Sequence, residues 1–216
     1  FLESSVSKKL EKLPTDKIIT PETHVVGPAI EALKFTGNNE GLREMLANLI
    51  ANAMNSDTTT KVHPSFVYVI KNLSPEEGLI IEWMKKNLLQ LGGSIPMIEY
   101  GTKISKRQPN QEFIDNYCFS KINYIIGDVI DKNKVEIYIK NFERLGIITI
   151  KPNRFMPKHD VKTGNNLPSD EYLQLKHKAS ELTTIGKGSN LEFYSKNGVL
   201  SLTKYGRNFV ATVTED

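Results

Sequence analysis

The feature that most constrains the fold of this chain is a helical repeat of apolar residues between Glu40 and Asn55. Apolar side chains recur there at steps of three and four residues, which places them on one face of an α-helix. They are Leu42, Met45, Leu46, Leu49, Ile50 and Ala53. Because a stripe this continuous has to be buried against other elements, we predict that Leu46 and Leu49 lie in a core.

A polar line runs along the opposite side of the same helix, through Glu44, Asn48 and Asn52. Such a line is typical of a face in contact with solvent, and this is the interpretation we favour. The alternative is a polar seam at an interface between two copies of the chain. The small residues Ala47 and Ala51 flank the apolar stripe and would let another helix pack closely.

Prolines and glycines indicate where the neighbouring elements begin and end. Pro21 and Pro28 disfavour helix in the residues before them, so we predict an extended segment over 16–28 and a helix that begins at Pro28. Further along, Ser74-Pro75-Glu76-Glu77 has the pattern of a capping box. It predicts a helix that ends before Gly92-Gly93.

The second half of the sequence predicts a different order of elements. Helical patterns cover 112–126 and 135–145, and the β-branched run over 147–150 predicts a strand. Asn197-Gly198 between two apolar runs is typical of a β-hairpin turn, and Thr203 can cap a final helix. With a short strand before them, these elements follow the order of a winged helix.

The predicted fold class is therefore mainly α with a small β component (α+β), in which an N-terminal helical unit precedes a winged-helix-like domain. Residues 1–20 are interpreted as a tail that ends a truncated amphipathic segment, because apolar residues are spaced among lysines there. Residues 21–73 form the helical core. Residues 74–216 form the winged-helix-like domain, with an inserted helix near 169–183 in a connection that is long for a simple wing.

Composition limits the class of protein. The net charge of +3 is mild, so any basic surface has to be local. Cys118 is the only cysteine, which excludes a disulfide within the chain and leads us to expect a reducing compartment, the cytoplasm. No apolar run reaches the roughly 20 residues that a membrane-spanning helix needs. A membrane would be reached only through residues upstream of Phe1.

The sequence contains no pattern that predicts catalysis, a metal site or a cofactor. Its histidines lack the spacing of metal ligands, and His63 before Pro64 is best explained as part of a helix entry. Cys118 lies among apolar and aromatic residues, which suits a buried side chain better than a reactive thiolate. Gly186-Lys187-Gly188-Ser189 lacks the upstream glycine of a phosphate-binding loop. We therefore expect a protein that is not an enzyme.

Basic residues gather on the predicted helix over 135–145 and just beyond it, where they outnumber acidic ones. The candidates for binding nucleic acid are Lys134, Lys140, Arg144, Lys151 and Arg154. In a winged helix they would lie on the second central helix and the wing, where phosphate contacts are common. The alternative, which we favour, is a face that contacts protein only, since Glu136 and Glu143 share the helix.

Four segments in the first third of the chain carry a family resemblance. They are Val25-Val26-Gly27-Pro28-Ala29-Ile30-Glu31-Ala32-Leu33, Leu42-Arg43-Glu44-Met45-Leu46-Ala47-Asn48-Leu49-Ile50-Ala51, Val62-His63-Pro64-Ser65-Phe66 and Leu73-Ser74-Pro75. In combination they resemble the Abi-alpha family. The resemblance implies a bacterial protein of abortive infection, in which an infected cell stops growing or dies before phage can spread. It implies no reaction and no catalytic residues.

Two functions follow from the residues and the resemblance together. The leading one is a non-catalytic component of phage defence that works through a protein partner or self-association, with nucleic acid as a further candidate partner. The alternative is a membrane-acting effector whose directing segment lies upstream of Phe1.

Overall fold

The computed structural model describes residues 1–36, 38–89, 92–104, 134–152 and 191–214. These residues are mainly helical and include a small three-stranded sheet, which confirms the predicted α+β class. The chain forms two compact units. The first comprises Phe1–Gly93, Asn141–Thr149 and Leu202–Asp216, and the second comprises Ser94–Lys140 and Ile150–Ser201. The predicted domain boundaries after residues 20 and 73 stay predictions.

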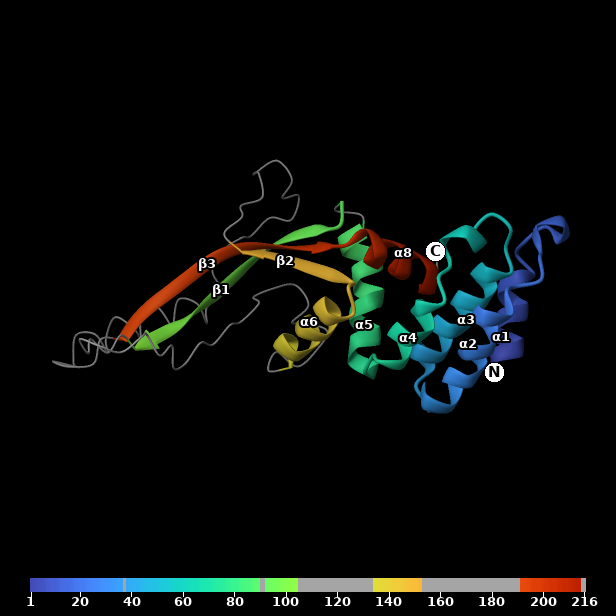
Figure 1. The fold of residues 1–216 in the computed structure, drawn as a ribbon, viewed down its shortest axis with the longest axis horizontal. Helices are drawn as coiled ribbons and strands as arrows, with labels where there is room; N and C mark the ends of the chain where they lie inside the picture. The colour runs from blue at the N-terminus through green and yellow to red at the C-terminus, as the bar shows by residue number, and fades with distance from the viewer. Residues whose placement is uncertain (37, 90–91, 105–133, 153–190, 215–216) are drawn as a thin grey trace. The chain divides into compact units, whose positions relative to one another are not determined.

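Helices build the first unit, as Figure 1 shows. They are α1 (Leu2–Leu10), α2 (Thr23–Thr36), α3 (Glu40–Ala53), α4 (Ser65–Lys71), α5 (Pro75–Trp83) and α8 (Lys204–Val213), with short 3-10 turns η1 (Thr15–Lys17) and η2 (Thr59–Lys61). The π-helical segment η3 (Met84–Leu89) extends α5. The helix that begins at the capping box therefore extends through η3 to Leu89, close to the end predicted before Gly92-Gly93.

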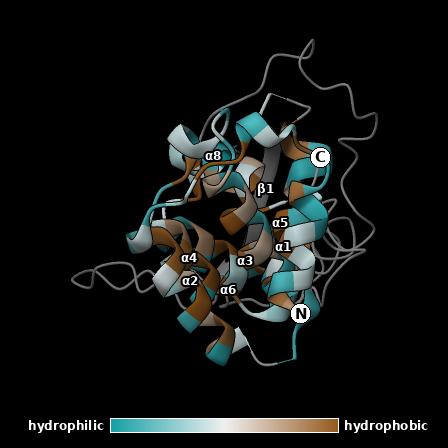
Figure 2. Cartoon of the chain, turned by 90° about the vertical axis from the view of Figure 1, so that its right-hand side faces the viewer, coloured by the Kyte–Doolittle hydropathy of each residue, from teal (hydrophilic) through white to brown (hydrophobic). Residues whose placement is uncertain are grey.

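Helix α3 is the centre of the first unit, because α1, α2, α4, α5 and α8 all contact it. Leu46 and Leu49 are fully buried, which confirms the predicted core. Ala47 and Ala51 are buried as well, so the small-residue flank does serve close packing. Of the surrounding helices, α4 is largely hydrophobic and α1 largely hydrophilic (Figure 2).

Helix α2 corrects one prediction. It begins at Thr23, so Pro28 lies inside it and not at its start. The predicted extended segment over 16–28 is therefore wrong from Thr23 onward, and also at Asp16 and Lys17, which lie in η1. The reason is packing: Val25, Ala29 and Ala32 are buried at helical spacing on both sides of the proline. This buried face offsets the hydrogen bond that the proline ring removes.

Local signals set the helix ends that follow. Ser74 Oγ accepts a hydrogen bond from the backbone N–H of Glu77, and the Glu77 carboxylate accepts one from Ser74 N at 2.7 Å, as predicted for a capping box. Gly92 and Gly93 adopt φ of 77° and 79°, and Gly146 adopts 74° after α6 (Val135–Arg144). These left-handed values favour glycine and end both helices.

The polar line of α3 corrects a second prediction, because it does not face solvent. Asn48 is 6% exposed and donates from Nδ2 to the backbone oxygen of Val213 at 2.9 Å. Asn52 donates to the backbone oxygen of Thr212, also at 2.9 Å. These carbonyls belong to the last residues of α8, where no N–H group of the same helix is available to donate to them. The line is a polar seam, and it lies within the chain.

The second unit contains most of the sheet. Its long strands are β1 (Ser94–Ile104) and β3 (Leu191–Leu202), which pair antiparallel from Ser94 opposite Ser201 to Ile104 opposite Leu191. β2 (Ile148–Pro152) completes the order β1-β3-β2. The strand predicted before the helices of the second half is therefore present as β1, and the strand predicted over 147–150 is present as β2.

The predicted hairpin at Asn197-Gly198 is wrong. Both residues lie inside the continuous strand β3, where Asn197 pairs with Ile98 and Gly198 with Met97. Pairing with β1 along the whole strand satisfies backbone groups that a turn would take out of the ladder. The long-range partner thus prevails over a strong local turn signal.

Two further predicted helices, over 112–126 and near 169–183, lie outside the described residues. The final helix predicted after Thr203 is present as α8. The winged helix itself stays a prediction.

Candidate functional site

The predicted basic residues lie on α6 and β2. Lys134, Lys140 and Arg144 are exposed on or beside α6, and Lys151 is exposed on β2. Arg154 lies outside the described residues. Four of the five candidates are therefore at the surface.

The buried side of α6 fixes which side chains point outward. Val135, Ile139 and Phe142 are at most 7% exposed and form the inner face of the helix. On the outer face, Ile137 is 67% exposed and lies three and seven residues before Lys140 and Arg144, the spacing of one helix face. The exposed α6 face, defined here as Ile137, Lys140 and Arg144, combines a large apolar side chain with two cations.

Arg144 is also the outer end of a hydrogen-bond network that the sequence did not predict. It donates to Asn141 Oδ1 from Nη2 at 2.6 Å and from Nε at 3.2 Å. Asn141 in turn donates from Nδ2 to Glu77 Oε1 at 2.7 Å and to the backbone oxygen of Asn72 at 3.0 Å. Glu77 is 3% exposed and already serves the capping box, so this network ties the start of α5 to the end of α6.

A second polar cluster joins His63, Ser65 and Tyr205. The backbone N–H of Ser65 donates to His63 Nδ1 at 3.2 Å, which makes this ring nitrogen an acceptor. The Ser65 hydroxyl lies 2.6 Å from the same nitrogen and 2.7 Å from the Tyr205 hydroxyl. The Tyr205 ring packs edge-on against the Phe66 ring, with 5.3 Å between the two ring centroids.

This cluster has the residue types of an activated serine, but its geometry has a structural explanation. His63 lies at the entry to α4, as predicted, and its ring bonds to the first turn of that helix. Ser65 then connects α4 to Tyr205 on α8. The cluster joins two helices, and no sequence pattern could indicate it because Ser65 and Tyr205 are 140 residues apart.

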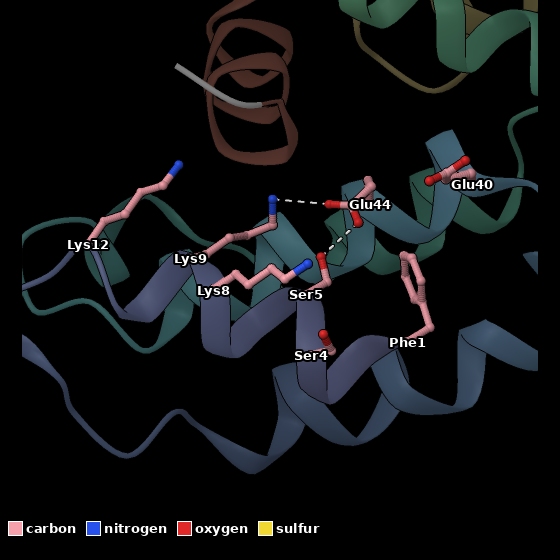
Figure 3. Close-up of a pocket in the computed structure, with 8 residues that line it drawn as sticks. All are labelled: Phe1, Ser4, Ser5, Lys8, Lys9, Lys12, Glu40 and Glu44. Atoms are coloured by element: carbon pink, nitrogen blue, oxygen red, sulfur yellow. Dashed lines mark hydrogen bonds and ion pairs between the residues drawn. The ribbon is translucent and has the colours of Figure 1, made fainter.

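A groove of about 530 Å³ lies between α1 and α3 (Figure 3). It is lined by Phe1, Ser4, Ser5, Lys8, Lys9, Lys12, Glu40 and Glu44. Lys9 Nζ forms an ion pair with Glu44 Oε2 at 3.0 Å, and the Ser5 hydroxyl donates to Glu44 Oε1 at 2.7 Å. The sequence showed the lysines of α1 but could not show that α3 closes a groove against them.

Two tests for other kinds of site concern only the described part of the chain. There, no three His, Cys, Asp or Glu side chains are grouped as metal ligands. No helix there combines the length and the apolar character needed to cross a membrane.

Comparison with known proteins gives one match. The family model described as abortive infection alpha matches residues 1–213. The comparisons with curated proteins and with solved structures give no match. The family match extends well beyond the four segments that carry the resemblance in the sequence.

Proposed function

Since this chain belongs to the abortive infection alpha family, which ties it to defence against phage, we propose that it is a non-catalytic recognition component of that defence. The observation that carries the proposal is the exposed α6 face. Its Ile137 is 67% exposed, while the neighbouring apolar residues of α6 are buried. A large exposed apolar side chain beside two cations is suited to a protein partner with an acidic rim.

Nucleic acid is the further candidate partner for the same face. Lys140 and Arg144 lie one helical turn apart, and phosphate contacts from such residues would weaken steeply with salt. Glu136 on the same helix is exposed and opposes a nucleic-acid backbone. Protein recognition is therefore the leading form of the proposal.

We place the protein among non-enzymes because its catalytic-looking cluster has structural partners. The His63–Ser65–Tyr205 cluster joins α4 to α8, and Glu77 is held by Ser74 and Asn141. The single cysteine supports the cytoplasm as the compartment. Turnover of a nucleotide, nucleic acid or peptide by the purified protein, abolished by one substitution, would overturn this part of the proposal.

The membrane-acting alternative gains no support from α1. The apolar side chain of Val6 is buried in the first unit, so this part of the helix is used for packing.

The experiment compares phage protection by cells that express the unchanged chain, Ile137→Asp or Lys140→Glu. Both α6 variants are expected to lose protection while the purified proteins keep their melting temperature, because both side chains are exposed. Lys34→Glu makes the same charge change at an exposed position of α2 and serves as the control. Full protection by both α6 variants would refute recognition through this face.

Fluorescence anisotropy with a DNA duplex then separates the two partner classes. Nucleic-acid recognition predicts binding at low salt that falls at physiological salt and is reduced in Lys140→Glu but not in Lys34→Glu. Absence of binding by the unchanged protein at low salt, with loss of protection in Ile137→Asp, leaves the protein partner.

A further inference from the structure

Two exposed aromatic side chains of the first unit play no part in the proposed function. Phe35 on α2 is 64% exposed, and Tyr68 on α4 is 57% exposed. The two helices contact each other, and Figure 2 shows hydrophobic residues along both. We propose that the α2–α4 patch, defined here as Glu31, Phe35, Tyr68 and Lys71, binds the same patch of a second copy of the chain. The proposal is independent of the exposed α6 face.

Lys71 joins the two aromatic residues into one surface. Its ammonium nitrogen lies 4.5 Å from the centroid of the Phe35 ring, so a side chain of α4 reaches the last turn of α2 at this point. Tyr68 lies three residues before Lys71 in α4, which places both side chains on one face of that helix. A single exposed apolar residue is common on a protein surface, whereas aromatic residues gathered in one place are typical of a contact surface.

Charges of both signs accompany the aromatic residues. Glu31 is exposed and lies one helical turn before Phe35, on the same face of α2. Its carboxylate has no ion-pair partner among the described residues. Lys71 is exposed on α4, and its ammonium contacts the Phe35 ring. The patch therefore presents an unpaired carboxylate on one helix and an ammonium on the other, with Phe35 in contact with the ammonium and one turn from the carboxylate.

Two-fold symmetry can make a patch of this kind complementary to itself. In a symmetric dimer the same surface of both copies meets, so a contact of Glu31 with the partner's Lys71 implies the reciprocal contact as well. Two ion pairs would then flank a centre built from the Phe35 and Tyr68 rings of both copies. This is the usual arrangement of an interface, with an apolar centre and a polar rim.

Other partners would use only part of the patch. Nucleic acid or an anionic membrane would attract Lys71 but repel Glu31, and an acidic peptide would leave Glu31 unpaired. The polar line of α3 is not available to a second copy, because Asn48 and Asn52 bond to α8 within the chain. A second copy is the occupant that matches both charges and both rings of the patch.

The test is sedimentation velocity of the purified chain over a wide range of protein concentrations. The unchanged chain is expected to form a dimer as the concentration rises. Glu31→Lys and Lys71→Glu should each weaken the dimer about a hundredfold, because symmetry repeats each like-charge contact and one such contact costs about tenfold. Phe35→Asp should weaken it too by placing charge in the apolar centre. Lys8→Glu makes the same charge change at an exposed position of α1 and should leave the dimer unchanged.

A mixture of the two charge variants gives the decisive result. In a mixed dimer of Glu31→Lys with Lys71→Glu, both contacts again join opposite charges. The mixture should therefore associate about as well as the unchanged chain, although each variant alone does not. All substituted side chains are exposed, so melting curves are expected to show that every variant stays folded.

Three outcomes would overturn the proposal. The first is an unchanged chain that stays monomeric, and the second is a mixture of the charge variants that stays monomeric. The third is a dimer that both charge variants retain, because it would form through another surface. If the monomeric chain instead sediments with phosphatidylglycerol vesicles, and Phe35→Asp does not, the patch belongs to a membrane contact and not to a second copy.

Discussion

The polar seam between α3 and α8 can be tested directly, because a buried seam and a face in contact with solvent predict different losses of stability on substitution. Asn48 is 6% exposed and its Nδ2 donates to the carbonyl oxygen of Val213. Asn48→Ala removes the donor and leaves a carbonyl at the end of α8 without its partner. The lost hydrogen bond and the unsatisfied buried acceptor together should cost about 2 kcal/mol. A solvated asparagine would cost less than about 0.5 kcal/mol.

Two further variants separate the hydrogen bond from the loss of volume. Asn48→Asp keeps the size but replaces the donor by an acceptor that faces the same carbonyl, so it should cost more than Asn48→Ala. Asn52→Ala should cost less, about 1 kcal/mol, because Asn52 is only partly buried although it donates to Thr212.

Urea denaturation followed by tryptophan fluorescence measures these losses. Trp83 is the only tryptophan and lies in α5, so it reports on the first unit. With a denaturant slope of about 2 kcal/mol per molar, Asn48→Ala should lower the urea midpoint by roughly 1 M. If both Asn48 variants lower the free energy of unfolding by less than about 0.5 kcal/mol, the buried seam is refuted and the face is in contact with solvent.

Three other substitutions test the packing of the first unit by the same denaturation. Leu49→Ala should cost about 2–5 kcal/mol, because the side chain is fully buried at the centre of α3. Gly206→Ala should cost about 3 kcal/mol, since a Cβ there would collide with the backbone oxygen of Ile147; a stable variant would contradict this close approach. Tyr205→Phe should cost about 1 kcal/mol by removing the hydrogen bond to Ser65, and an unchanged midpoint would show that this contact adds no stability.

Signals that act over a few residues predicted much of the fold. The stripe of α3, the capping box at Ser74 and the helix end at Gly92-Gly93 each depend on neighbours within one or two turns, and the structure contains all three. Two strong local signals failed for the same physical reason. Pro28 is held inside α2 by buried neighbours, and Asn197-Gly198 is held in β3 by pairing with β1.

The sequence could not predict contacts between distant segments. Asn48 and Val213 are 165 residues apart, and Asn141 and Glu77 are 64 apart, so no spacing rule relates them. For the candidate site the limit is similar. The sequence identified the cations of α6, but the exposure of Ile137 depends on which face of the helix is buried.

Because Arg144 belongs to a hydrogen-bond network with Asn141 and Glu77, not every residue of the exposed α6 face is equally suited to test partner recognition. Arg144 contacts Asn141, which bonds to the buried Glu77, so its replacement changes both the surface charge and a contact that ties α5 to α6. A loss of binding in Arg144→Ala would therefore be ambiguous unless stability were unchanged. Ile137 lies on the same exposed α6 face, and its apolar side chain, 67% exposed, cannot take part in this hydrogen-bond network. Recognition through α6 is for this reason to be judged first on Ile137, with Lys140 and Arg144 informative beside a measured melting temperature.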